Sequence, residues 1–299
     1  MKLPPYLKKG DLIGIVSTAS KIDREVVEPA VDLLKDLGFR IELGQYVFEQ
    51  FNNFAGTDQQ RSSDLQKMLD HPEVKVIICS RGGYGTLRTL KGINWENFTQ
   101  NPKWIVGFSD VTVLHAQMNN LGIATIHGVM PRYFQNENGQ TQSFEYLLKA
   151  LQGEEIKYKI APTQYNKTGV VSGELIGGNL SILYSLRGTP IDMNTEGKIL
   201  FIEDLSEYLY HLDRIMMNFK TGGLFNHLGG LIVGGFTGMK DNEIPYGKGV
   251  EEIILNAVAD YNFPVIFNFP TGHQPDNFAL KLGCNTNIKV NADVVSFEQ

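Results

Sequence analysis

The segment VKVIICSRGGYG, residues Val74–Gly85, is the most informative part of the sequence for the fold. Its first six residues, Val74–Cys79, form an apolar run with the length of a buried β-strand, and the glycine-rich loop Ser80–Gly85 follows directly. In open parallel sheets, ligands bind in loops beyond the carboxyl ends of the strands. The segment therefore predicts a buried strand followed by a glycine-rich loop at the edge of the sheet where ligands usually bind.

The same alternation of apolar runs and helical patterns extends through the first half of the chain. Helical spacing of apolar residues from Val27 to Leu37, a capping box of Thr57 and Gln60, and a third pattern from Val111 to Leu121 predict helices. Strands separated by helices indicate a mostly parallel sheet covered on both faces, which is a doubly wound α/β domain. The predicted strands are Leu12–Val16, Phe39–Leu43, Val74–Cys79, Trp104–Phe108 and Ala124–His127.

The pattern becomes irregular between residues 135 and 167, where polar and charged residues dominate. We therefore predict an N-terminal α/β domain over residues 1–150 and a smaller mixed α/β domain over residues 168–299. A helix at Phe144–Leu151 is expected to close the first domain. In the second domain we expect strands at Ile199–Ile202, Leu231–Val233 and Val265–Phe269, and helices at Tyr208–Phe219 and Val250–Val258.

The composition is that of an ordinary globular protein. The 299 residues include 27 Lys and Arg and 33 Asp and Glu, a formal net charge of −6, and the mean hydropathy is −0.16. With a pI near 5.6, nothing neutralises phosphates in bulk, so neither nucleic acid nor a membrane is an expected partner. The sequence shows no secretory signal and no apolar span of ~18 residues, which predicts a soluble, cytoplasmic protein.

Two cysteines, Cys79 and Cys284, are too few for a disulfide framework or a cysteine-rich zinc site. Cys79 closes an apolar run and is expected to be a buried thiol, although one disulfide between the two stays open. No His-Glu-x-x-His motif or His/Asp/Glu cluster is present, so no metal is expected.

The glycine-rich loop does not match the known nucleotide-binding loops. A dinucleotide fingerprint would need glycine at the position of Arg88, and a phosphate-binding loop would need a Gly-Lys-Ser/Thr sequence. Two interpretations stay open: a tight turn without a ligand, or a cradle of backbone N–H groups for an anion or oxyanion. We expect no cofactor.

The fourth strand leads into Gly107-Phe108-Ser109-Asp110 and then into a helix. A serine at a strand-to-helix turn occupies the place of the nucleophile in a nucleophile elbow. The Gly-x-Ser-x-Gly pattern is only half met, because Val111 replaces its second glycine. On this segment alone, Ser109 is either a nucleophile or the cap of the following helix.

A serine nucleophile needs a base, and the base needs an acid that orients it. Among six histidines, His273 follows a strand and the turn Pro270–Gly272, which suits a functional loop, and His127 at the end of a strand is a second candidate. Glu203 ends an apolar strand, a poor position for a charge without a partner. It could instead cap the next helix or pair with Arg214, and Asp204 competes for the same role.

Together these segments resemble the LD-carboxypeptidase family of serine peptidases, which also contains the microcin-immunity peptidases. The resemblance spans nearly the whole chain and rests on the order and spacing of its motifs. The family often has Leu-Pro-x-Gly after the histidine, where this chain has Leu280–Gly283. The matching segments are Gly10-Asp11 with the first strand, Ser80–Gly85, Gly107–Thr112, Gly177–Leu180, Phe201–Asp204 and Gly272-His273.

The resemblance implies a catalytic triad that falls on Ser109, Glu203 and His273. The backbone N–H groups of Gly83 and Asp110 would form the oxyanion hole. The nucleophile would then belong to the N-terminal domain and its partners to the C-terminal domain, so we expect the site at the domain interface.

The resemblance further implies removal of the terminal D-alanine from cytoplasmic murein tetrapeptides during cell-wall recycling, by a homodimer. Arg81, Gly82 and Tyr84 are the candidate substrate-binding residues. The residue before the scissile bond, diaminopimelate or lysine, stays open. The alternative is a microcin-immunity type peptidase acting on aminoacyl-nucleotide conjugates. It would need an aromatic platform for a base, and no candidate is evident in a loop of the second domain.

Overall fold

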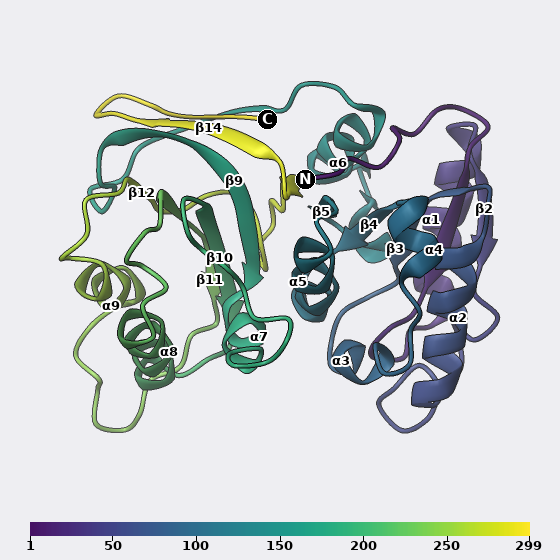
Figure 1. The fold of residues 1–299 in the computed structure, drawn as a ribbon, viewed down its shortest axis with the longest axis horizontal. Helices are drawn as coiled ribbons and strands as arrows, with labels where there is room; N and C mark the ends of the chain where they lie inside the picture. The colour runs from purple at the N-terminus through teal and green to yellow at the C-terminus, as the bar shows by residue number, and fades with distance from the viewer. The chain divides into compact units, whose positions relative to one another are not determined.

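The protein is described by a computed structural model that covers residues 1–299. The chain forms two compact units, drawn in Figure 1. Unit 1 contains Met1–Glu154 and Phe278–Lys281, and unit 2 contains Glu155–Asn277 and Leu282–Gln299. The predicted division, residues 1–150 and 168–299, did not anticipate that the short segment Phe278–Lys281 returns to unit 1.

Unit 1 is built on a six-stranded sheet with the order β13-β5-β4-β3-β1-β2. The pairs β1–β2, β1–β3, β3–β4 and β4–β5 are all parallel. This confirms the predicted doubly wound α/β class. The strand order reverses between β1 and β3, and the loops that follow these two strands therefore flank the expected ligand position. The strands are β1 (Leu12–Val16), β2 (Arg40–Leu43), β3 (Val74–Cys79), β4 (Trp104–Gly107), β5 (Thr125–His127) and β13 (Leu280–Leu282).

Helices connect the strands of unit 1, and two of them, α2 and α5, pack on the same apolar face of the sheet. Leu65 of α2 and Leu114 of α5 are fully buried there with Ile77 and Ile105 of the sheet, each contributing about 1.5–3 kcal/mol by burial. The predicted capping box of Thr57 and Gln60 is present at the start of α2. The helices are α1 (Arg24–Asp36), α2 (Asp58–Asp70), α3 (Thr86–Thr89), α4 (Glu96–Gln100), α5 (Thr112–Asn120) and α6 (Gln142–Gln152), with 3-10 turns at Ser109–Val111 and Pro131–Tyr133 and a hairpin of β6 (Gln135–Asn136) and β7 (Gly139–Gln140).

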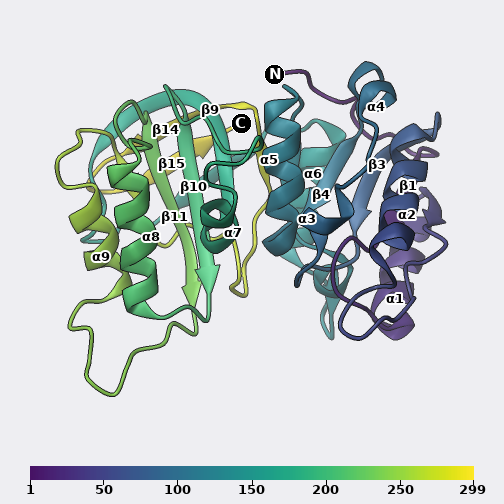
Figure 2. The ribbon, with the colours of Figure 1, turned by 60° about the horizontal axis from the view of Figure 1, so that its bottom comes forward.

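Unit 2 contains a seven-stranded mixed sheet with the order β12-β11-β10-β9-β14-β15-β8. The strands from β9 to β12 are parallel, whereas β14 and β15 run antiparallel to their neighbours. Figure 2 shows α8 and α9 side by side along β10 and β11. Buried apolar side chains of these two helices and of the sheet form one core. The elements are β8 (Lys157–Ile160), β9 (Gly169–Asn179), α7 (Leu180–Ser185), β10 (Ile199–Leu205), α8 (Leu209–Thr221), β11 (Gly230–Thr237), α9 (Val250–Ala257), β12 (Val265–Ile266), β14 (Asn285–Val290) and β15 (Val295–Glu298).

Both cysteines are free thiols. Cys79 is fully buried at the end of β3, and burial raises the pKa of its thiol to about 12. Cys284, between β13 and β14, is partly accessible.

None of the helices has the length and apolar character that crossing a membrane requires.

Candidate active site

Ser109 lies at the turn between β4 and α5, beyond the carboxyl end of its strand. Its backbone has φ +65°, a left-handed conformation that costs a non-glycine residue about 1–3 kcal/mol. Such strain persists only where the surrounding structure enforces it, and it is typical of the serine in a nucleophile elbow.

The structure also rejects the alternative in which Ser109 caps the next helix. The N-cap residue of the 3-10 turn is Phe108, and that of α5 is Val111. Neither turn nor helix receives a hydrogen bond from a capping side chain. The hydroxyl of Ser109 therefore does not cap the start of the following helix.

The glycine-rich loop lies directly against Ser109. A Cβ atom at Gly82 would stand 2.9 Å from Ser109 Oγ and 3.4 Å from the backbone nitrogen of Asp110. Only a residue without a side chain leaves room there. The backbone of the glycine-rich loop therefore lies beside the hydroxyl of Ser109.

The side chain of Asp110 fixes this loop to the elbow. The carboxylate is almost fully buried, and its Oδ2 accepts a hydrogen bond from the backbone N–H of Thr86 at 2.8 Å. Burial raises the pKa of Asp110, and the hydrogen bonds from Thr86 and Gly85 oppose that rise. Asp110 thus contributes a structural side chain as well as a backbone N–H beside Ser109.

The side chain of His115 connects the elbow to the neighbouring strand β5. Its Nε2 lies 3.0 Å from the carbonyl oxygen of Gly107, and because a carbonyl only accepts, Nε2 carries the proton and donates. Its Nδ1 then accepts from the Thr125 hydroxyl at 2.8 Å. Burial lowers the pKa of His115 to about 4, so the ring is neutral near pH 7 and has a structural role.

In unit 2, Glu203 and His273 form a close pair. The Nδ1 atom of His273 lies 2.7 Å from Glu203 Oε2, and the backbone N–H of His273 donates to the same oxygen at 3.1 Å. An ionised carboxylate only accepts, so Nδ1 carries the proton and Nε2 keeps its lone pair. This is the tautomer that a general base needs.

The position of this pair is enforced by its surroundings. Glu203 is completely buried in β10, and its second oxygen, Oε1, is buried without a hydrogen bond. Gly272 has φ +109°, and a Cβ there would stand 2.7 Å from Glu203 Cβ, so glycine is required for this approach.

Asp204, the competing acid, has a different task. Its carboxylate accepts from Asn179 Nδ2 at 2.9 Å and from the Ser181 backbone N–H at 2.9 Å, which anchors the start of α7. Glu203 does not end its strand as predicted, because β10 continues to Leu205. Arg214 instead lies over the ring of Tyr210.

Three further histidines have partners or positions outside the Glu203–His273 pair. His71 contacts Glu42, and His211 pairs with Glu207 at 2.6 Å. His127, the second candidate base, is fully buried, and its ring centroid lies 5.9 Å from that of Phe108 with the two rings tilted by 53°. The described residues contain no group of three or more His, Cys, Asp or Glu that would hold a metal ion.

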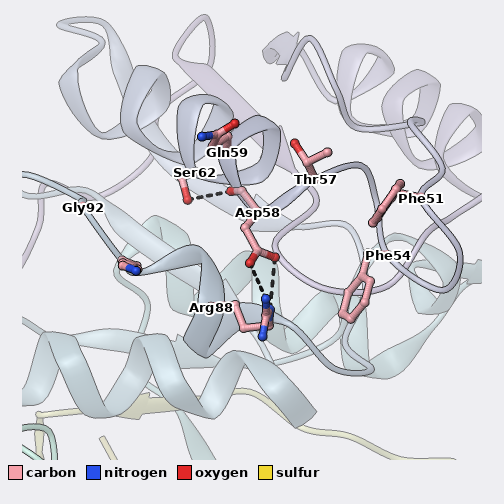
Figure 3. A pocket seen from close by; sticks show the side chains of 9 residues that line it. Phe51, Phe54, Thr57, Asp58, Gln59, Ser62, Arg88 and Gly92 are labelled. Atoms are coloured by element: carbon pink, nitrogen blue, oxygen red, sulfur yellow. Dashed lines mark hydrogen bonds and ion pairs between the residues drawn. The ribbon is translucent and has the colours of Figure 1, made fainter.

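The candidate substrate-binding residues have mixed surroundings. Arg81 is exposed and donates to the Lys21 carbonyl oxygen at 2.9 Å. Tyr84 is exposed, with its ring centroid 6.0 Å from that of Phe54. Phe54 belongs to a pocket of about 730 Å³ in unit 1, which Figure 3 shows and which the sequence did not reveal.

A second feature was missed in unit 2. The sequence offered no aromatic platform there, but Tyr208 and Tyr210, just beyond β10, are each 39% exposed. Their ring centroids lie 5.6 Å apart. Because Tyr208 fits the helical pattern that runs to Phe219, the sequence suggested a core position rather than an exposed one.

Family models match both halves of the chain. The LD-carboxypeptidase N-terminal domain matches residues 13–128, and the LD-carboxypeptidase C-terminal domain matches residues 172–288. The chain therefore belongs to the LD-carboxypeptidase family, and it is a peptidase.

Individual relatives agree with this assignment. The chain is 33% identical over 288 residues to a probable murein peptide carboxypeptidase of Bacillus subtilis, covering 94% of this chain and 89% of that one. It is 29% identical to the murein tetrapeptide carboxypeptidase of Pseudomonas aeruginosa, covering 91% of each. The crystal structure of muramoyltetrapeptide carboxypeptidase from Oxalobacter formigenes matches with a TM-score of 0.88 and 25% identity, over 96% of this chain and 98% of that one.

The fold is shared with a further group. A structure of the microcin C7 self-immunity protein in complex with glutamyl sulfamoyl guanosine matches with a TM-score of 0.86 and 20% identity, over 99% of this chain and 98% of that one. This likeness concerns the fold alone.

Proposed function

We propose that the protein is a serine carboxypeptidase that hydrolyses the L,D-peptide bond before the terminal D-alanine of murein tetrapeptides. The observation that carries the proposal is the strained backbone of Ser109 at φ +65°, which holds a hydroxyl against a glycine-rich loop. The names of the relatives from Bacillus subtilis and Pseudomonas aeruginosa support the substrate class.

In the proposed mechanism, Ser109 Oγ attacks the scissile carbonyl carbon, and its proton passes to Nε2 of His273. Glu203 holds the ring by Nδ1 and stabilises the imidazolium that forms. The carbonyl oxygen becomes an oxyanion, which accepts hydrogen bonds from the backbone N–H groups of Gly83 and Asp110. The intermediate collapses, the C–N bond breaks, and the D-alanine amine takes the proton from His273.

The second half of the reaction repeats these steps with water. His273 removes a proton from the water, and the water oxygen attacks the acyl-enzyme carbonyl carbon. The ester bond to Ser109 then breaks, and His273 gives the proton to Ser109 Oγ. The products are D-alanine and a tripeptide with a free carboxylate. None of these reaction steps requires a metal ion or a redox cofactor.

The test is mass spectrometry of L-Ala-γ-D-Glu-meso-diaminopimelate-D-Ala after incubation with the protein. The wild type is expected to release one alanine, and Ser109→Ala is expected to release none. The lysine-containing tetrapeptide is measured in parallel to define the residue before the scissile bond. Intact peptide in every wild-type reaction would refute the proposed substrate.

The cellular setting is part of the proposal. Release of D-alanine from murein fragments in the cytoplasm would belong to cell-wall recycling, and the resemblance to the family implies a homodimer. Sedimentation velocity of the purified protein tests the oligomeric state, because a dimer of 33.4 kDa chains sediments well ahead of a monomer.

A second candidate function is supported by Tyr208 and Tyr210. The Nζ atom of Lys240 lies 5.8 Å from the Tyr208 ring centroid, and the Arg214 guanidinium carbon lies 5.2 Å from that of Tyr210. Exposed aromatic faces beside cations suit a planar base attached to an anionic linker. A microcin-immunity type peptidase would cleave an aminoacyl sulfamoyl adenosine, and turnover of this compound without turnover of the tetrapeptide would favour that function.

A further inference from the structure

The pocket of unit 1 lies at the same edge of the sheet as Ser109. Its walls come from the loop after β2, from the start of α2 and from α3 with the turn that follows, as Figure 3 shows. All of these segments lie beyond the carboxyl ends of β2 or β3, which is the usual ligand-binding edge of an open α/β sheet. Its volume of about 730 Å³ falls within the ~300–1,000 Å³ typical of small-molecule sites.

Aromatic side chains form one part of the wall. Phe51, which is 54% exposed, and Phe54 both line the pocket. Tyr84 is 56% exposed and lies outside the lining, with its ring centroid 6.0 Å from that of Phe54. Clustered exposed aromatic rings on a polar surface are typical of a contact surface for a ligand. The flat faces of such rings pack well against the C–H face of a sugar ring.

Polar groups of both kinds line the rest of the pocket. Arg88 Nη2 lies 2.8 Å from Asp58 Oδ2, and the buried Arg61 also donates to this carboxylate. The two guanidinium groups hold the pKa of Asp58 below its usual range, so it is ionised. Because Arg88 is already paired, the pocket offers donors and acceptors to hydroxyl and amide groups rather than a two-point site for a carboxylate.

The pocket begins within a short distance of the proposed nucleophile. Gly85 packs against Phe54, since a Cβ there would stand 3.2 Å from its Cδ1 atom, and Gly82 packs against Ser109. The three residue steps from Gly82 to Gly85 span at most about 11 Å. The three residues that precede the terminal D-alanine of a tetrapeptide span a similar length. A group attached to the N-terminus of that peptide can therefore reach Phe54 while the scissile carbonyl lies at Ser109.

We propose that this pocket binds the N-acylated amino sugar attached to the N-terminus of a murein tetrapeptide, with its ring against Phe51 and Phe54. The proposal rests on the proposed function and extends it, because it assigns the preference between sugar-linked and free peptides. The name of the Oxalobacter formigenes relative contains the muramoyl group, which is consistent with a sugar-linked substrate for that protein.

The first experiment compares kcat/KM for muramoyl-tetrapeptide with kcat/KM for the free tetrapeptide. The wild type is expected to favour the sugar-linked substrate at least tenfold. Gln59 also lines the pocket, from the start of α2. Phe51→Ala and Gln59→Ala are expected to bring this ratio close to one. Phe48→Ala is the matched control, because Phe48 lies on the same loop under Arg24 and outside the pocket, so its ratio stays at the wild-type value.

A wild-type ratio near one, or an unchanged ratio in Phe51→Ala, would overturn the proposal. A second experiment does not depend on turnover: calorimetric binding of N-acetylmuramyl-L-Ala-γ-D-Glu to Ser109→Ala. The double variant Ser109→Ala/Phe51→Ala is expected to bind this compound at least tenfold more weakly than Ser109→Ala. Equal affinity of the two variants, or no binding by Ser109→Ala, would refute the proposed pocket. If neither peptide is hydrolysed but the muramyl dipeptide binds through Phe51, the proposed reaction fails while the pocket stands.

Discussion

His273 and Glu203 lie 70 positions apart in the chain and share two hydrogen bonds, both to Glu203 Oε2. One comes from the ring and the other from the backbone, so the carboxylate fixes the ring and the loop that carries it. The first prediction concerns this carboxylate. Glu203→Gln places an amide where Nδ1–H must donate, which favours the wrong tautomer and is expected to lower kcat by about 10³–10⁴-fold.

The measurement is tetrapeptide turnover by Glu203→Gln, with circular dichroism to verify the fold. Asp204→Asn is the control in the neighbouring position, because it loosens α7 and is expected to change the free energy of unfolding more than kcat. A Glu203→Gln enzyme within tenfold of the wild type would remove Glu203 from the proposed triad.

The second prediction concerns the contact between Gly82 and Ser109. In Gly82→Ala, the new methyl group would stand 2.9 Å from Ser109 Oγ and displace it, and we expect kcat to fall by about 10²-fold or more, as for other small misplacements of reacting groups. Gly249→Ala is the control, since its Cβ would meet no atom closer than 3.7 Å. Full activity in Gly82→Ala would show that the loop does not confine the nucleophile.

The third prediction concerns the side chain of Asp110. Asp110→Asn keeps the shape but presents NH₂ to a position where the carboxylate accepts hydrogen bonds from Thr86 and Gly85. If the loop carries an oxyanion donor, its displacement is expected to lower kcat by about 10²-fold with little change in KM. Kinetics and amide hydrogen exchange at residues 82–86 are measured together, and unchanged exchange in this loop would contradict the prediction.

The fourth prediction concerns the strain at Ser109. Ser109→Gly relieves the cost of φ +65°, whereas Ser109→Ala keeps it. Ser109→Gly is therefore expected to unfold with a free energy about 1 kcal/mol higher than Ser109→Ala, partly offset by the greater flexibility of glycine in the unfolded chain. Urea denaturation of both inactive variants measures this difference, and a less stable Ser109→Gly would argue against stored strain.

The fifth prediction concerns pH and His115. Its folded pKa of about 4 lies below the reference value of 6.5, so between these values the unfolded chain binds more protons than the folded one. Stability from the neutral ring is present above pH 6.5 and is lost as the pH falls toward 4, by about 3 kcal/mol in total. His115→Gln lacks this titration, and its unfolding free energy is expected to fall less steeply than that of the wild type between pH 6.5 and 4.5. Parallel pH profiles of the two proteins would disprove the assignment.

The sequence predicted those parts of the fold that have strong local patterns. The apolar run Val74–Cys79 became β3 with the same bounds, and Thr57 with Gln60 marked the start of α2. It could not predict β9, whose first residues are alternately exposed and only partly buried, or the return of Phe278–Lys281 to the sheet of unit 1. These depend on long-range pairing, which a local pattern does not contain.

The sequence likewise predicted some parts of the candidate site and not others. The sequence located Ser109 at a turn, but the choice between cap and nucleophile depended on a backbone angle that no residue pattern specifies. Glu203 and Asp204 were indistinguishable as neighbours, and only their partners, His273 and Ser181, separate their tasks. The exposed rings of Tyr208 and Tyr210 were missed because tyrosine at helical spacing is as common in a core as on a surface.

The contrast between the two thiols has a practical consequence for solution studies. With a pKa of about 12 and complete burial, Cys79 forms almost no thiolate at pH 8 and is expected to resist maleimides, whereas the partly accessible Cys284 is expected to react. The unaltered chain can therefore be labelled at one position, eleven residues beyond His273. A fluorophore can then be attached at a defined position without engineered cysteines.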